Sequence, residues 1–285
     1  MKNLLNKWML ALVVLSTFGL ASCGDDDDDK KTETEEVNYA DAKLLKMVSK
    51  VTSDEHFFGP LVNECNYEYN ADGYVSKYSD LSSGNNLYDT FDYSKLKTEN
   101  KIVVTHKYES DYDSETSSYT YFLENGRVSK ITCGDKEVSL IYNGKNQLTK
   151  VVYSDYEYTV LTWENDVVTK IKFINTESKD ENSEEEITYS TVPAGSFGSA
   201  VISTAVMCDG ADGIGLNKMF GANLKYLPEK IVRTDDGENL VSTSEISFDS
   251  VTKLPVSEKT TYTKKSEEKK TQITETTYTW DIPSK

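Results

Sequence analysis

A phrase of four residues returns at intervals of twenty in the middle of the chain. Its three copies are Val128-Ser129-Lys130-Ile131, Leu148-Thr149-Lys150-Val151 and Val168-Thr169-Lys170-Ile171. Twenty residues correspond to one strand–turn–strand–turn unit, because strands average about 5–6 residues. The repeat therefore predicts consecutive antiparallel hairpins over residues 128–174.

Side-chain alternation along a strand assigns the two faces of these hairpins. The aliphatic residues that end the phrase share one face, which we expect to be buried: Ile131, Val151 and Ile171. The lysines that precede them share the other face, within reach of acidic neighbours: Lys130, Lys150 and Lys170. One apolar and one charged face are typical of an antiparallel sheet that is wet on one side.

Degraded copies of the hairpin pattern extend over the rest of the chain. Tyr69–Lys77 matches Phe122–Lys130 in the order aromatic, Gly, Val and Lys, and a Thr-rich strand is expected over Ile273–Ile282. Residues 38–51 suit either a helix or a strand, and a strand is favoured because the following hairpin needs a partner. We expect an all-β fold: a large curved or partly closed antiparallel sheet of about a dozen strands in consecutive hairpins.

One glycine-rich segment, residues 194–224, interrupts the hairpin pattern. Between Pro193 and Leu224 it holds six of the 15 glycines and few charges, and Leu216, Met219 and Phe220 indicate a short helical turn. We predict a partly helical insert that covers the apolar face of the sheet and forms the edge of any binding site.

The first twenty-two residues have the pattern of a secretory signal. Lys2 and Lys7 precede an apolar run, Trp8 to Leu20, which is too short for a transmembrane helix of about 20 residues. The run ends in Leu20-Ala21-Ser22-Cys23, which resembles the lipobox of bacterial lipoproteins. We expect cleavage before Cys23 and lipidation of its thiol; the alternative is an ordinary signal peptide followed by an incidental cysteine.

An acidic stretch follows, and we expect residues 23–36 to be an extended tether. Gly24 and five consecutive aspartates, Asp25 to Asp29, cannot bury apolar surface. Cys–Gly–polyAsp also resembles the export signal of lipoproteins displayed on the outer surface of Bacteroidetes-type bacteria, although a solvated linker would look the same. Residues 37–285 then form a single β domain.

Composition excludes several classes of function. A net charge of −17 argues against nucleic acid, because a phosphate backbone requires clustered Lys and Arg. Neither a nucleophile elbow nor a zinc or phosphate-binding motif occurs, so no catalytic residue, metal site or cofactor is predicted. We interpret His56 and His106 as structural or surface residues, Asp209–Gly213 as a turn, and the remaining cysteines as small buried hydrophobes: Cys65, Cys133 and Cys208.

Three aromatic residues are candidate ligand contacts. Tyr156, Tyr158 and Trp163 cluster in the sequence, and sugar rings stack on such side chains. The favoured interpretation is nevertheless that they fill half-buried strand positions, as Tyr and Trp commonly do.

The chain resembles a family of Bacteroidetes lipoproteins of unknown function with a porin-like fold. The resemblance rests on the hairpin phrase at Tyr69–Lys77 and Phe122–Lys130, and on Gly215–Gly221 running into Leu227-Pro228. It implies no activity and no catalytic residue. The lysine-bearing faces and the lipobox argue for a water-soluble sheet, because a membrane-inserted barrel faces the lipid with apolar residues.

These observations lead to one favoured function and one alternative. We expect a lipid-anchored protein of the outer membrane that faces the cell exterior and serves as a non-enzymatic binding or envelope-assembly module, with a glycan or a protein as its ligand. The alternative is a metal-independent glycan hydrolase that uses a carboxylate pair, although no pair is singled out among 48 acidic residues.

Overall fold

The protein is an all-β barrel. The computed structural model describes residues 42–53, 61–82, 84–179, 182–193, 216, 219–235, 240–252, 254–264 and 269–282. The elements are β1 Lys43–Ser53, β2 Leu61–Tyr69, β3 Val75–Ser82, β4 Asn85–Asp92, α2 Leu96–Glu99, β5 Lys101–Ser110, β6 Ser114–Glu124, β7 Arg127–Cys133, β8 Lys136–Tyr142, β9 Leu148–Val152, β10 Glu157–Glu164, β11 Val167–Asn175, β12 Ser183–Pro193, β13 Tyr226–Asp235, β14 Leu240–Phe248, β15 Pro255–Lys264 and β16 Lys269–Asp281.

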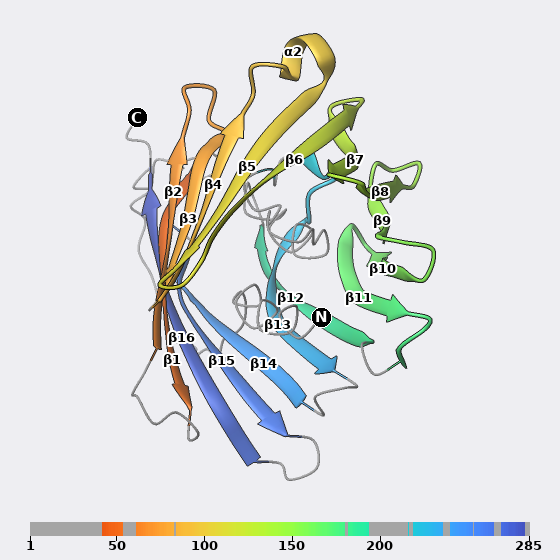
Figure 1. Cartoon of the computed structure of the whole chain (residues 1–285). Coiled ribbons are helices and arrows are strands. Elements are labelled where there is room, and N and C mark those ends of the chain that lie inside the picture. Colours follow the sequence, from red (N-terminus) through yellow and green to blue (C-terminus); the bar gives the residue numbers. More distant parts are fainter. Residues whose placement is uncertain are drawn as a thin grey trace, which may run out of the picture.

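The sixteen strands follow one another around a closed antiparallel barrel (Figure 1). The first and last strands complete the circle, with Leu44 opposite Trp280 and Val51 opposite Thr274. We call the end where β1 begins and β16 ends the terminal end, and the opposite end the far end. The short strands β7–β11 form one side, across from the long strands β1 and β16.

Consecutive antiparallel hairpins are confirmed, but two details of the predicted sheet are wrong. The sheet has sixteen strands rather than about a dozen, and it is closed rather than partly closed. The strand favoured for residues 38–51 is found as β1, Lys43–Ser53, with residues 38–41 outside the described residues, and closure depends on its pairing with β16. These two strands lie more than 200 residues apart in the sequence, so no local sequence pattern predicts that they pair.

The repeated phrase forms a β-bulge at the start of a strand. Val128 and Ile131 are three residues apart, yet both face inward and are 0% and 1% exposed. A register shift opposite Phe122 and Leu123 inserts the extra residue that makes this possible. The Ser129 hydroxyl donates across the bulge to the Phe122 carbonyl at 3.3 Å. Corresponding shifts occur at β2–β3, β8–β9, β10–β11, β12–β13 and β14–β15.

In most hairpins, an aromatic side chain toward the end of the second strand donates a hydrogen bond to a backbone carbonyl at the start of the first strand. Tyr142 Oη donates to the Val128 carbonyl at 2.6 Å, and Trp163 Nε1 donates to the Leu148 carbonyl at 2.7 Å. We call these bonds aromatic clamps; the remaining ones are Tyr69 to Leu44, Tyr93 to Val75, Tyr189 to Val168 and Trp280 to Pro255. Burial raises the pKa of all four clamp tyrosines, to about 12 for Tyr69, so their hydroxyls remain protonated donors.

The described part of the insert contains no α-helix, so the predicted partly helical character is wrong. Gly221 adopts φ +86°, and a Cβ at this position would lie 2.4 Å from the Asn146 carbonyl oxygen. Its neighbour Ala222 donates its amide to that oxygen at 2.7 Å. The chain is thus held as a bent strand-like segment against the β8–β9 turn, with Gly221 bridged to Gln147.

The apolar core lies toward the terminal end of the barrel. The described insert residues pack into it, and Leu216, Met219, Phe220 and Leu224 are 1–5% exposed. The three phrase residues predicted to be buried also belong to it: Ile131, Val151 and Ile171. The remaining residues of the predicted insert, 194–215 and 217–218, lie outside the described residues.

Candidate functional site

Buried polar side chains lie beside the apolar core in the barrel interior. The side chains that face inward here come from β12–β16 and β1–β5 and are buried nonetheless; they include Asn63, Asp89, His106, Arg233, Ser242, Ser244, Glu258, Thr260, Thr274 and Thr276. Buried polar groups are tolerated when they hydrogen-bond one another. The buried carboxylates and their partners illustrate how this happens.

Glu258 and Glu185 each have a partner on an adjoining strand, and Glu258 has a second partner on its own strand. Glu258 accepts the Tyr278 hydroxyl at 2.6 Å and the Thr260 hydroxyl at 3.0 Å. Glu185 lies 3.5 Å from Arg233 across the β12–β13 pair. Burial raises the pKa of Glu185, and the nearby guanidinium of Arg233 opposes that shift. These contacts fasten neighbouring strands to one another.

Asp89 and His106 form a second buried pair, between β4 and β5. His106 Nδ1 lies 2.8 Å from Asp89 Oδ1, and the ring meets Tyr119 edge-on. Burial raises the pKa of Asp89, and His106 lowers it. Ser117 stands opposite His106 in register, but the described contacts include no hydrogen bond between these two side chains. The pair therefore lacks the nucleophile contact that a Ser-His-Asp triad requires.

Asp80 and Cys65 face each other across β2 and β3 beside this pair. Burial raises the pKa of Asp80 to about 6, and a hydrogen bond from Cys65 opposes the shift. Tyr78 Oη donates to Cys65 Sγ at 3.4 Å. Within the described residues, no group of three or more His, Cys, Asp or Glu side chains could hold a metal ion.

The outer wall of the barrel carries charge. Lysines and glutamates face each other across neighbouring strands, in the pairs Lys46–Glu64 at 2.6 Å, Lys77–Glu68 at 3.0 Å and Lys130–Glu137 at 3.1 Å. Lys150 lies over the ring of Tyr158, 3.9 Å from its centroid. The lysines of the repeated phrase thus face outward, as predicted, and their partners cover part of each side chain.

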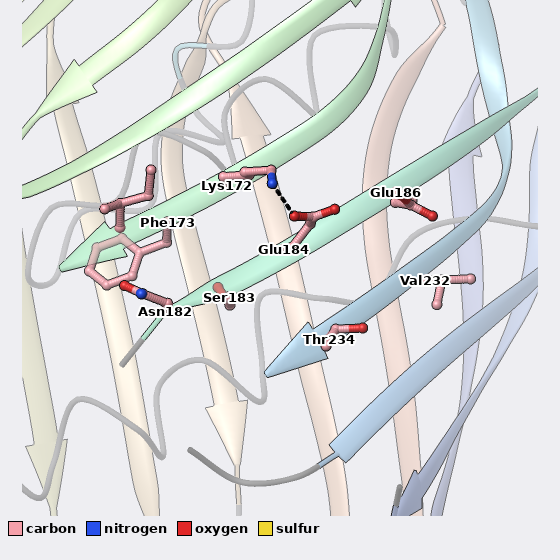
Figure 2. A pocket seen from close by; sticks show the side chains of 9 residues that line it. Lys172, Phe173, Asn182, Ser183, Glu184, Glu186, Val232 and Thr234 are labelled. Atoms are coloured by element: carbon pink, nitrogen blue, oxygen red, sulfur yellow. Dashed lines mark ion pairs between the residues drawn. The ribbon is translucent and has the colours of Figure 1, made fainter. Parts of the chain in front are cut away.

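A hollow of about 600 Å³ opens on this outer wall over β11, β12 and β13 (Figure 2). Lys172 and Glu184 form an ion pair at its centre, and Lys170 bonds both Glu184 and Glu186. Because Lys170 and Lys172 donate to it, the pKa of Glu184 is lowered; its glutamate partners raise the pKa of Lys170. Lys170 lies beside the hollow, which is lined by Lys172, Phe173, Ile174, Asn182, Ser183, Glu184, Glu186, Val232 and Thr234.

The three aromatics singled out in the sequence lie on different faces of the barrel. Tyr156 is in the β9–β10 turn and is 40% exposed. Tyr158 points outward beside Lys150, opposite Ile174 of the hollow. Trp163 belongs to an aromatic clamp and packs against the apolar core. The structure therefore leaves Tyr156 in an exposed turn, places Tyr158 on the outer wall and turns Trp163 toward the core.

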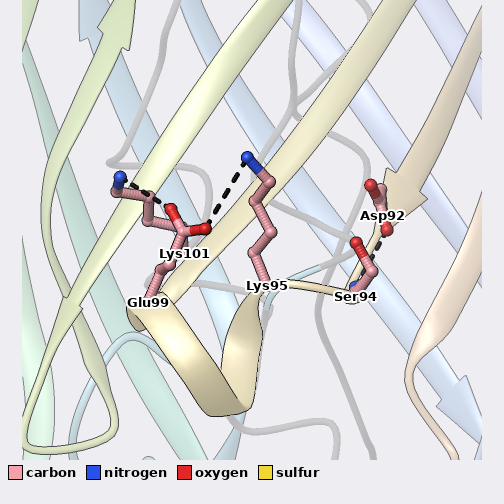
Figure 3. A network of polar contacts seen from close by, with 5 residues as sticks. All are labelled: Asp92, Ser94, Lys95, Glu99 and Lys101. Atoms are coloured by element: carbon pink, nitrogen blue, oxygen red, sulfur yellow. Dashed lines mark hydrogen bonds and ion pairs between the residues drawn. The ribbon is translucent and has the colours of Figure 1, made fainter.

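A separate polar network lies in the turn that contains α2 (Figure 3). Glu99 pairs with Lys101 at 3.0 Å and Lys95 at 3.8 Å, and the Asp92 carboxylate accepts the Ser94 amide at 2.9 Å. The Lys101 and Ser94 bonds lower the pKa of Glu99 and Asp92 respectively. These solvent-exposed contacts shape a turn and assemble no enclosed site.

Several residues named from the sequence cannot be placed. Cys23, the tether, His56 and Cys208 lie outside the described residues. Cys65 is buried and Cys133 is half-buried. Sequence reasoning missed Arg233 and the buried carboxylates Asp80, Asp89, Glu185 and Glu258, because inward-facing acids look like solvent-facing ones in a chain this acidic.

Fold and surface together define a closed sixteen-strand antiparallel barrel with an ion-paired outer wall. Over the described residues, no helix is long and apolar enough to cross a membrane.

Comparison with solved structures places this chain among porin-like barrels in fold. A porin-like protein from Bacteroides uniformis superimposes with a TM-score of 0.57 at 14% identity, over 84% of this chain and 98% of that one. A second, from Bacteroides vulgatus, gives a TM-score of 0.47 at 11% identity, over 85% and 100% of the two chains. No protein-family model and no curated protein sequence matches the chain.

Proposed function

We propose that this protein is a lipid-anchored module of the cell envelope whose barrel stands in water and binds a glycan or protein partner without catalysing a reaction. The observation that carries the proposal is the ion-paired outer wall. The barrel has the strand number of a porin and the outer surface of a soluble protein.

A barrel embedded in a bilayer presents an apolar band about 25 Å tall, flanked by aromatic girdles. Here the corresponding face carries Lys46, Glu64, Lys130 and Lys170, each with an ionic partner. A lysine or arginine on the lipid face of such a barrel costs about 2–4 kcal/mol at the midplane. Repetition of the charged pattern around the wall supports contact with water rather than lipid.

The anchor in this proposal is Cys23. The described chain begins at Ala42, so about twenty residues separate the lipidated cysteine from β1 at the terminal end. Their acidic composition favours an extended spacer. Porin-like fold neighbours from Bacteroides are consistent with an outer-membrane or envelope location. We place the barrel on the outer face, because the tether resembles a surface-export signal.

Membrane extraction of the Cys23→Ala variant tests the proposal. The wild-type chain should float with membranes, whereas the variant should stay unprocessed at Ser22-Cys23. A second variant, in which an ordinary cleavable signal peptide replaces residues 1–22 and Ser replaces Cys23, should be released in soluble, folded form. Recovery of that second variant in carbonate-resistant membranes would show that the barrel itself inserts, and the proposal would fail.

Protease accessibility on intact cells tests whether the protein is displayed on the cell surface. Protease added to intact cells should cleave an epitope tag placed at Tyr112, which is 98% exposed in the β5–β6 turn. Protection of the tag in intact cells, with cleavage after lysis, would assign the protein to the inner side of the outer membrane instead.

A further inference from the structure

The outer-wall hollow over β11–β13 has the chemistry of a site for an uncharged, hydroxyl-rich ligand. Its charged groups are matched to one another: Lys170 and Lys172 are paired with Glu184 and Glu186. The raised pKa of Lys170 and the lowered pKa of Glu184 keep both groups ionised at neutral pH. The site thus offers strong hydrogen-bond donors and acceptors with no net charge among these four groups.

Tyr158, on the neighbouring strand β10, is the aromatic residue next to this hollow on the outer wall. It stands on the outer wall opposite Ile174, which lines the hollow. Lys150 covers the ring from the β9 side, at 3.9 Å from the ring centroid. The strand order β9–β10–β11–β12 places the hollow on the other side of Tyr158 from Lys150. An aromatic face carries partial negative charge and attracts partially positive C–H groups.

Tyr156 lies in the β9–β10 turn that precedes Tyr158. The Thr176 amide donates to the Tyr156 carbonyl at 2.9 Å, which holds the β9–β10 turn against the start of the β11–β12 connection. The side chain itself is 40% exposed. Tyr158 is thus the register neighbour of a residue that lines the hollow, and the volume of about 600 Å³ falls within the roughly 300–1,000 Å³ of typical ligand pockets.

We propose that this hollow binds a neutral oligosaccharide, with one sugar ring stacked against Tyr158 and its hydroxyls bonded to Glu184, Lys172 and Asn182. Pyranose rings present a C–H face and a rim of hydroxyls, the two surfaces that the site complements. Anionic glycans are disfavoured, because the chain carries a net charge of −17 and the site has no surplus cation among its lining residues. The inference names the ligand class of the proposed binding module and rests on that proposal.

The test uses the full-length chain in detergent and four neutral hexasaccharides as probes: maltohexaose, cellohexaose, xylohexaose and mannohexaose. Hexagalacturonic acid is the anionic comparison. We expect calorimetry to detect at least one neutral probe, with Tyr158→Ala weakening it about tenfold, the loss expected from one aromatic stacking contact. Glu184→Gln should weaken the same probe, and Tyr112→Ala, a matched exposed tyrosine on a distant turn, should leave the affinity unchanged.

Two results would overturn the inference. One is the absence of binding to all four neutral probes by a folded protein; the other is binding that Tyr158→Ala and Glu184→Gln leave unchanged. Thermal unfolding of each variant confirms that its fold is intact. Failure of this inference is separable from failure of the proposed function, because the anchoring and extraction experiments make no use of sugar binding.

Discussion

The two halves of the barrel interior are built on different principles. At the terminal end, bulged strand starts and aromatic clamps repeat from hairpin to hairpin around an apolar core. In the polar part of the interior the contacts are individual: Asp89 with His106, Glu185 with Arg233, and Glu258 with Tyr278. Repetition therefore specifies the apolar part of the interior, whereas each polar contact is particular to its own pair of strands.

The largest effect should come from the apolar half. Ile131→Ala removes a fully buried side chain next to a bulge and should cost ~2–5 kcal/mol of unfolding free energy. Val151→Ala removes fewer atoms and should cost less. Chemical denaturation measures both, and equal losses from Ile131→Ala and from an outward lysine substitution would contradict the assignment of faces.

A substitution of Asp80 should instead stabilise the fold, and only at pH values above the ordinary pKa of this carboxyl group. Burial raises the pKa of Asp80 from 3.8 to about 6, so the folded state holds this proton more tightly than the unfolded chain. The stability contributed by the protonated form is complete below pH ~4 and is lost as pH rises through ~6, by up to about 3 kcal/mol.

Asp80→Asn removes that ionisation. The variant should be more stable than the wild type at pH 7.5, and the difference should shrink as pH falls to 4. Denaturation curves at intervals of one pH unit measure it. Asp92→Asn serves as an exposed control whose carboxyl has a lowered pKa, so its shift with pH should have the opposite sign. A pH-independent difference for Asp80→Asn would reject this account of the polar half.

Removal of a single clamp should have a smaller effect. Tyr142→Phe leaves the ring in place but removes the hydroxyl that donates to the Val128 carbonyl. We expect a loss of ~1 kcal/mol, the net value of a typical hydrogen bond. Tyr156→Phe, on an exposed turn, is the matched comparison and should have no effect on thermal unfolding.

We expect the smallest change in unfolding free energy from a substitution on the outer wall. Lys130→Ala breaks an exposed pair with Glu137 and should change the unfolding free energy by less than ~0.5 kcal/mol. High salt should make wild type and variant indistinguishable in the same denaturation assay. A loss comparable to that of Ile131→Ala would mean that the outer wall is buried against something.

How far the sequence anticipates this structure differs between the two halves. The phrase Val128–Ile131 correctly predicts hairpins, the buried Ile131 and the outward Lys130, because alternation is a local property. The sequence does not predict the aromatic clamps. The donors Tyr142, Trp163 and Tyr189 follow their acceptors at unequal sequence separations. Aromatic residues are also common at half-buried strand positions, so their presence alone does not indicate a hydrogen bond. Closure, and pairs such as Glu185 with Arg233, depend on strands that meet only in the folded chain.

The candidate site was anticipated only in part. Tyr156 and Tyr158 were named from the sequence, but their partners at the hollow were not. Glu184 and Lys172 look like members of an ordinary charged run until the register of β11 and β12 sets them face to face. Trp163 shows the limit of proximity in sequence, since it lies five residues from Tyr158 and on the opposite side of the wall.

Closure through β1 and β16 has a mechanical consequence for an anchored protein. With the Cys23 anchor proposed above, a pull on the tether would reach the barrel at the start of β1, whose two edges are bonded to β2 and β16 along much of its length. Force directed along this strand loads those bonds together, in shear, whereas a strand at the edge of an open sheet can peel away one bond at a time. Drag on a bound partner would thus be shared by two ladders at once, and the strand nearest the membrane is among the hardest to extract.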